Sequence, residues 1–230
     1  YRINKLQLVP DTDTDDDGTV DNNLPNALEL VDLMLASQDF SIESFNALLQ
    51  SNLDSWTTVV LIDAKVDSDY WLAMDLLIGE ADESFQLSVN PLSYDDQGDP
   101  VATVEGAFTS ETMFFAGPDD FAINVSFYEG MDPLAVTIEK ARFNGAMTAK
   151  SNAGNLTGAL PVDELINKVI DPLLDPDGTD INGDGIVETK AEILKLIWSI
   201  APNAGDIDLG NDRTGISCRF TYSSVQATWD

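Results

Sequence analysis

Residues 134–143 read LAVTIEKARF, a stretch in which apolar and polar side chains alternate. This period of two, together with the β-branched residues, is typical of a strand with one buried face. Short segments of similar texture lie on both sides, separated by turn-forming residues at 95–100, 117–120 and 129–133. We expect strands at 57–66, 70–78, 85–89, 101–108, 113–116, 121–128, 134–143 and 146–149. This regular spacing predicts an antiparallel β-sandwich or an open barrel.

Helical spacing of apolar residues replaces alternation on both sides of this β core. Asn23 is a suitable N-cap for one helix, and Ser41 precedes a second. Further helices are expected at 161–173 and 190–200, and strands at 1–9 and 216–229.

The predicted fold class is therefore α+β, mainly β, in a single domain spanning residues 1–230. Helical segments at 10–55 and 161–201 flank a β core at 57–158. The side chains that we expect to be buried include Val60, Ile62, Leu72, Val125 and Ile138.

The charge of the chain is strongly one-sided, with 41 acidic residues against 11 basic ones and a formal net charge of −30. Such a field repels phosphate backbones, which argues against nucleic-acid binding. The negative charge favours binding of cations or basic partners, or it only keeps the protein soluble. A halophilic or marine origin would also explain it. Because no uninterrupted apolar stretch approaches about 18 residues, we expect no membrane span.

An Asp-rich loop near the N-terminus has the spacing of a calcium site. It reads DTDTDDDGTVD from Asp11 to Asp21, with Gly18 able to make a sharp bend. Calcium takes about six to eight oxygen ligands, and alternate residues of a tight loop point inward. Thr19 is expected to contribute its carbonyl, and Val20 to anchor the loop. The predicted ligands are Asp13, Asp15, Asp17, Thr19 and Asp21.

A second loop, DINGDGIVE from Asp180 to Glu188, repeats the spacing and places Gly185 at the sixth position. Glu192 follows the loop, where it is either a further ligand or the partner of Thr189 in a capping box at the helix start. The predicted ligands of this second calcium loop are Asp180, Asn182, Asp184, Ile186, Glu188 and Glu192.

Both loops resemble the EF-hand consensus D-x-[DN]-x-[DN]-G. The first also resembles thrombospondin type 3 loops, and the second resembles half of a dockerin. The bidentate Glu of an EF-hand is missing, because Leu24 and Ala191 stand at position 12. The loops lie at opposite ends of the chain, so we reject a dockerin or a calmodulin-type sensor. A third cation site at Asp206, Asp208 and Asp212 stays open.

Four segments look similar to uncharacterised exported lipoproteins of myxobacteria and their relatives: YRINKL, DDDGTVDNNLPNALELVD, GNLTGALPVDELI and GISCRFTYSSVQATWD. This resemblance implies an extracellular or cell-surface location, with a lipid anchor on a segment outside this chain. It implies no activity. The chain begins at Tyr1 without a signal peptide, so we expect a mature or trimmed product, and export is an inference.

The sequence offers no credible catalytic set, so we expect no enzyme. Histidine is absent, which removes Ser-His-Asp and Cys-His arrangements. The single cysteine, Cys218, lies in an apolar run and is expected to be buried and inert. A carboxylate pair could hydrolyse glycosides, but 41 acidic residues make any such pair unspecific.

The leading functional expectation is a calcium-stabilised structural module that assembles with itself or with other envelope proteins. The alternative is a calcium-dependent carbohydrate-binding module that holds polysaccharide on its sheet. Trp71 is the best candidate for an exposed aromatic, whereas Trp198 is expected in the core. A row of exposed aromatics on the sheet would favour sugar binding, and an exposed apolar patch or an unpaired edge strand would favour assembly.

Overall fold

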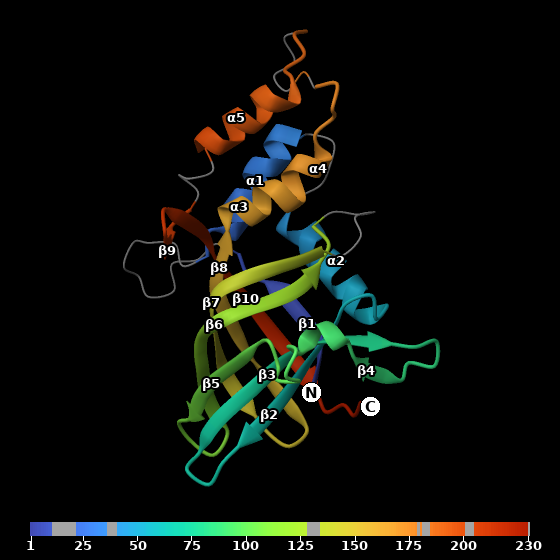
Figure 1. Cartoon of the computed structure of the whole chain (residues 1–230), viewed down its shortest axis with the longest axis vertical. Coiled ribbons are helices and arrows are strands. Elements are labelled where there is room, and N and C mark those ends of the chain that lie inside the picture. The colour runs from blue at the N-terminus through green and yellow to red at the C-terminus, as the bar shows by residue number, and fades with distance from the viewer. Residues whose placement is uncertain are drawn as a thin grey trace.

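The computed structural model describes residues 1–10, 22–35, 41–127, 134–178, 180, 185–200 and 205–229. Strands form one end of the molecule and helices gather at the other (Figure 1). The strands are β1 (Arg2–Leu8), β2 (Val59–Val66), β3 (Trp71–Ala81), β4 (Leu87–Val89), β5 (Thr103–Phe108), β6 (Met113–Val125), β7 (Leu134–Met147), β8 (Ser151–Pro161), β9 (Ile207–Gly210) and β10 (Arg213–Val225). The helical segments are α1 (Leu24–Leu35), α2 (Ile42–Asp54), η1 (Pro91–Ser93), α3 (Val162–Glu164), η2 (Leu165–Ile170), α4 (Asp171–Leu173) and α5 (Lys190–Ile200).

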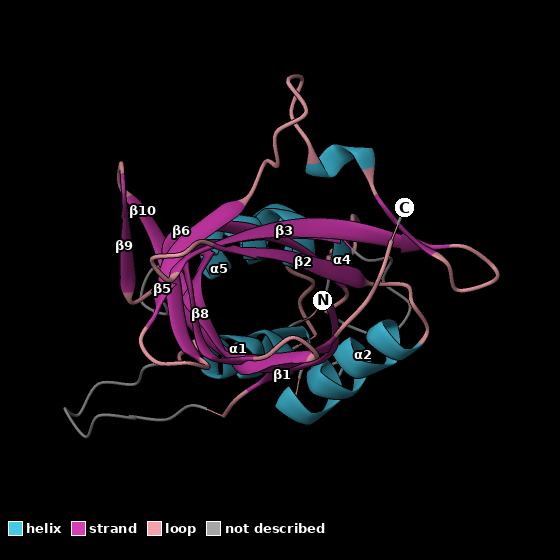
Figure 2. Ribbon diagram, turned by 90° about the horizontal axis from the view of Figure 1, so that it is seen from below, coloured by secondary structure: helices cyan, strands magenta, loops and turns pink. Residues whose placement is uncertain are grey.

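Eight of these strands form an antiparallel ring. Their order is β1-β2-β3-β5-β6-β7-β8-β10, and β10 pairs again with β1. The junction between β1 and β2 is narrow: Arg2 pairs with Leu61, and the Ile62 N–H donates to the Tyr1 carbonyl at 2.8 Å. Figure 2 looks into this ring, with α2 packed beside β1. The prediction of a mainly β, antiparallel, barrel-like fold is therefore confirmed.

Side chains fill the interior of the ring. The five residues predicted to be buried are at most 5% exposed, and Cys218 is 1% exposed. Burial raises the pKa of the Cys218 thiol to about 12, which keeps it protonated and inert. An apolar void of about 20 Å³ remains between the strands and the side chains of Leu24 and Phe45, and it is no larger than a water molecule. This void is too small for an organic ligand.

Two predicted strand breaks are wrong. The expected turn at 117–120 lies inside β6, and the expected break between the segments 134–143 and 146–149 lies inside β7, which runs on to Met147. Both strands contain register shifts, one of them between Glu139 and Arg142. An extra residue in a β-bulge interrupts alternation without ending the pairing, so the sequence pattern resembles a turn.

Strand β8 was not predicted, because its sequence SNAGNLTGALP is rich in residues typical of turns. Its Gly154 pairs with Gly145 of β7 so closely that a Cβ on Gly154 would lie 1.9 Å from the Asn144 carbonyl oxygen. The two glycines separate Phe114 from Tyr222 in one cross-strand row. Glycine at these two positions therefore allows the backbones of β7 and β8 to approach each other closely.

The C-terminal part of the chain departs from the expectation in two further ways. The helix expected at 161–173 is α3, η2 and α4 in succession, with a π-helical middle. The short strand β9 was also missed. It turns into β10 through Asn211 and Asp212, both with positive φ, which is the geometry of a type I′ hairpin turn.

Candidate functional site

The first Asp-rich loop, with its predicted ligands Asp13, Asp15, Asp17, Thr19 and Asp21, lies outside the described residues. The residues at its base are described. The Asn22 amide donates to the Val9 carbonyl at 2.5 Å and accepts from the Arg219 N–H at 3.1 Å. Asn22 thereby joins both ends of the acidic loop to strand β10.

The second loop is described in part, because Asn182 and Asp184 lie outside the described residues. Gly185 has a φ of +87°, and its N–H donates to Asp180 Oδ2 at 2.8 Å. The sixth position of the loop therefore bends back to the carboxylate at the first position. Ile186 and Glu188 follow the bend, while Val187, at the position equivalent to Val20, is 58% exposed.

Glu192 lies in a capping box. Its Oε2 accepts from the Thr189 N–H at 2.9 Å and from the Thr189 hydroxyl at 2.8 Å, and the Glu192 N–H donates to the Thr189 hydroxyl at 3.3 Å. These bonds lower the pKa of the Glu192 carboxyl. The capping alternative therefore accounts for this carboxylate at the start of α5.

The proposed third cluster serves the β9–β10 hairpin. Asp206 accepts from the N–H and hydroxyl of Ser217 at 2.7 and 2.5 Å, and Asp208 accepts from the Gly210 N–H at 2.7 Å. Within the described ranges, no group of three or more acidic or cysteine side chains is arranged to hold a metal ion.

A groove of about 370 Å³ crosses the outer face of β3, β5 and β6. Trp71 is 50% exposed and forms one wall. The Asp67 carboxylate holds the start of β3, because it accepts from the Trp71 N–H at 2.9 Å. The remaining lining comes from Thr103, Glu105, Gly117, Pro118 and Asp119. The groove thus combines an aromatic surface with a hydroxyl and two exposed carboxylates.

A buried carboxylate behind the groove orients the Thr103 side chain. Asp75 pairs with Thr103 across β3 and β5, and its side chain is 7% exposed. Its Oδ1 accepts from the Thr103 hydroxyl at 2.7 Å, and its Oδ2 accepts from the Lys65 ammonium at 2.6 Å. This interaction raises the pKa of Lys65. Charge-assisted hydrogen bonds through Asp75 therefore hold Thr103 in the groove lining.

A second aromatic residue continues the same outer row. Trp71 pairs with Ala107, and Ala107 pairs with Phe115, which is also 50% exposed. Adjacent strands lie about 4.8 Å apart, so the two rings rise from strands about 10 Å apart. The small Ala107 side chain between them leaves both rings accessible. Alternation along each strand could have placed Trp71 and Phe115 on the outer face of the sheet. The pairing of the strands, which brings the two residues into one row, could not be read from the sequence.

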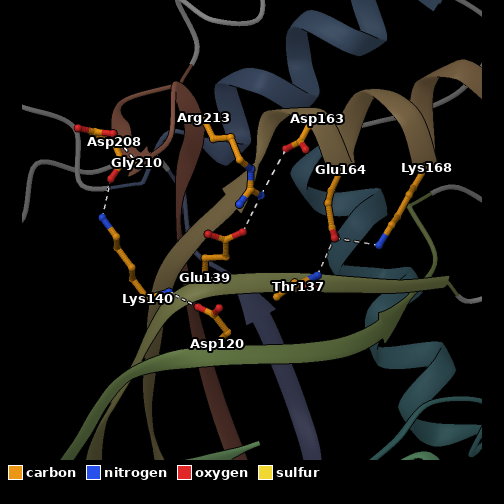
Figure 3. Close-up of polar contacts among 10 residues, drawn as sticks. All are labelled: Asp120, Thr137, Glu139, Lys140, Asp163, Glu164, Lys168, Asp208, Gly210 and Arg213. Atoms are coloured by element: carbon orange, nitrogen blue, oxygen red, sulfur yellow. Dashed lines mark hydrogen bonds and ion pairs between the residues drawn. The ribbon is translucent and has the colours of Figure 1, made fainter. Parts of the chain in front are cut away.

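Polar contacts at the other end of the ring join the helices to the strands (Figure 3). Arg213 of β10 contacts Glu139 at 2.6 Å and Asp163 of α3 at 3.7 Å. Glu164 accepts from the Thr137 N–H at 2.8 Å and pairs with Lys168 at 2.9 Å. These contacts fix α3 and the β9–β10 hairpin around the bulge of β7.

The chain matches no family model, no curated protein and no solved structure in the comparisons made. No helix in the described ranges is long and apolar enough to cross a bilayer.

Proposed function

We propose that this protein is a carbohydrate-binding module that uses the Trp71 groove. The observation that carries the proposal is the half-exposed Trp71 beside Thr103, Glu105 and Asp119 in one concave surface. The C–H face of a sugar ring packs on an aromatic ring, while its hydroxyls need acceptors and donors beside it. This groove supplies the aromatic surface and the acceptors, because Glu105 and Asp119 carry carboxylates and the Thr103 hydroxyl, whose hydrogen is donated to Asp75, can still accept.

The row from Trp71 through Ala107 to Phe115 favours a polysaccharide over a single sugar. A row of exposed aromatics is the feature that we expect to favour sugar binding. A chain of sugars that extends beyond the groove reaches the second ring, whereas a monosaccharide is confined to the groove.

We also propose that calcium stabilises the second loop. Its support is the positive φ of Gly185 and the bond from Gly185 to Asp180. The proposed ligands are Asp180, Asn182, Asp184, the Ile186 carbonyl and Glu188, while Glu192 serves the capping box. A bound calcium ion would offset the repulsion between these carboxylates without taking part in sugar binding.

The remaining parts of the proposal rest on the sequence. Export to the cell surface follows from the lipoprotein resemblance, and a non-enzymatic role follows from the lack of histidine and nucleophile motifs. Surface display and polysaccharide binding are compatible, because a protein at the cell surface is exposed to extracellular polysaccharide.

The test is binding to neutral polysaccharides. Binding is measured by Trp fluorescence and by retention of the protein on insoluble glycans. Trp71→Ala should weaken binding at least about tenfold, since burying an aromatic side chain contributes roughly 1.5–3 kcal/mol. Phe85→Ala is the control, because Phe85 is 62% exposed but lies outside the groove lining. Equal losses in both variants, or no binding by the parent protein, would exclude the proposal.

Assembly is the second candidate, and strand β9 favours it. This strand ends the sheet order and pairs with β10 on one side, so its other edge can accept a strand from a second molecule. Light scattering should then show oligomers that grow with concentration. A monomer at all concentrations, with and without calcium, would contradict assembly.

A further inference from the structure

A second groove of about 470 Å³ lies on the outer face of β7, β8 and β10, away from Trp71. Three of its lining residues are basic, although the whole chain has only 11 basic residues against 41 acidic ones. Such a concentration of positive charge is unexpected on a surface with this composition. The lining consists of Lys140, Arg142, Thr157, Gly158, Ala159, Ile207, Ser217, Cys218 and Arg219.

Strand register places two of the basic residues on either side of a threonine. Arg142 pairs with Thr157, and Thr157 pairs with Arg219, so the three residues form one cross-strand row. Side chains in such a row point to the same face of a sheet. Two guanidinium groups therefore flank the Thr157 hydroxyl on the outer face.

The bulge in β7 adds the third basic residue. Lys140 has a φ of +54° and lies between Glu139 and Arg142, where the register shifts. Strict alternation would turn Lys140 inward, but the extra residue leaves it exposed while Ala141 is buried. Lys140 and Arg142 consequently both face outward beside the groove.

The positive charges in the groove lack carboxylate partners among the described residues. The Lys140 ammonium donates to the carbonyl of Asp208, and Arg219 Nη2 reaches Asn155 at 3.5 Å. Arg219 Nε is buried without a hydrogen-bond partner. Arg213, at the start of the same strand as Arg219, differs from these three residues because it contacts two carboxylates.

Acidic side chains beside the groove are already engaged, since Asp120 Oδ1 accepts from the Lys140 backbone N–H at 3.2 Å. Asp206 accepts two hydrogen bonds from Ser217 at one end of the groove. Ile207 and Ala159 add apolar surface to the lining. A ligand with an anionic group and a small organic body would contact both parts.

We propose that this groove binds a tetrahedral oxyanion, a sulfate or phosphate group that is either free or esterified to a sugar. Guanidinium groups form paired hydrogen bonds with such oxygens, and Lys140 adds a point charge. The size of the groove lies within the range of ligand sites, about 300–1,000 Å³. The site is independent of the Trp71 groove, since the two share no lining residue.

Calorimetric titration with sodium sulfate, sodium phosphate, galactose and galactose 6-sulfate tests the proposal. In the Trp71→Ala variant, which removes the aromatic side of the other groove, we expect saturable binding of the anions and none of galactose. Similar affinity for sulfate and its ester would identify the free anion as the ligand, whereas at least about tenfold tighter binding of the ester would identify a sulfated sugar.

Arg142→Gln and Arg219→Gln should each weaken anion binding about tenfold or more, because each removes charge-assisted hydrogen bonds to the anion. Lys150→Gln is the control, since it makes the same charge change outside the groove lining. A thermal melt of each variant verifies that it folds. If Arg219→Gln does not fold, Arg142→Gln still tests the proposal, because Arg142 is exposed and its substitution should not disturb the fold. Absence of saturable binding, or an equal loss in Lys150→Gln, would overturn the proposal.

Discussion

Asp75 lies on the outer face of β3, where an unpaired carboxylate would be costly to bury. Its bonds to Lys65 and Thr103 compensate for that burial and tie β2, β3 and β5 together behind the Trp71 groove. Lys65 also lies 3.8 Å from Asp63, whose side chain is 47% exposed. The two aspartates therefore contact one lysine in different environments.

Asp75→Ala should lower the free energy of unfolding by about 1–3 kcal/mol, because it leaves the Thr103 hydroxyl without its acceptor. Asp63→Ala is the matched control and should cost less than about 1 kcal/mol, as is usual for an exposed pair. Urea denaturation of both variants measures the difference. Equal destabilisation would show that the buried carboxylate has no special role in holding Thr103 in the groove lining.

At the scale of elements, the capping box at the start of α5 gives the second loop a defined end. Thr189 and Glu192 satisfy each other's backbone and side-chain groups. Because the bonds favour the ionised carboxylate, the folded pKa of Glu192 is lower than its unfolded value. Its stabilising effect is thus present above the unfolded pKa and is lost as the pH falls through the folded pKa.

Glu192→Gln should therefore reduce stability at neutral pH, with the difference from the parent protein shrinking as the solution becomes acidic. Thr189→Ala should move the pKa of the Glu192 carboxyl back towards its ordinary value. Chemical-shift titration in the presence of chelator measures the pKa, and melts across the pH range measure the stability. A carboxyl that titrates at its ordinary value would contradict the capping box.

For the whole molecule, the net charge of −30 opposes compactness through self-repulsion. Calcium bound at the second loop would reduce this repulsion and fix the chain between α4 and α5. The free energy gained is RT ln(1 + [Ca²⁺]/Kd), about 1.4 kcal/mol at a tenfold excess over Kd.

Calcium should raise the melting temperature by about 3–6 °C relative to chelator, since about 1 kcal/mol corresponds to 2–4 °C in a chain of this size. Asp180→Ala should remove part of this shift. Asp177→Ala makes the same charge change outside the loop and should leave the calcium response intact. Identical melts with calcium, magnesium and chelator would mean that these loops are only acidic turns.

The sequence by itself determined the local features of this protein. Alternation identified the strand texture and the buried residues such as Ile62 and Ile138, and the spacing from Thr189 to Glu192 indicated a capping box as one of two alternatives for Glu192. Cys218 was placed in the core because its neighbours are apolar. These features depend on side chains within a few residues of one another, so a linear pattern contains them.

The tertiary structure alone decided the ring closure, the continuity of β6 and β7 and the composition of both grooves. Arg142, Thr157 and Arg219 become neighbours only through the register of three strands. Bulges shift that register by one residue and reverse the facing of a side chain such as Lys140. Pairing between distant segments sets such positions, because the same alternation is compatible with several registers.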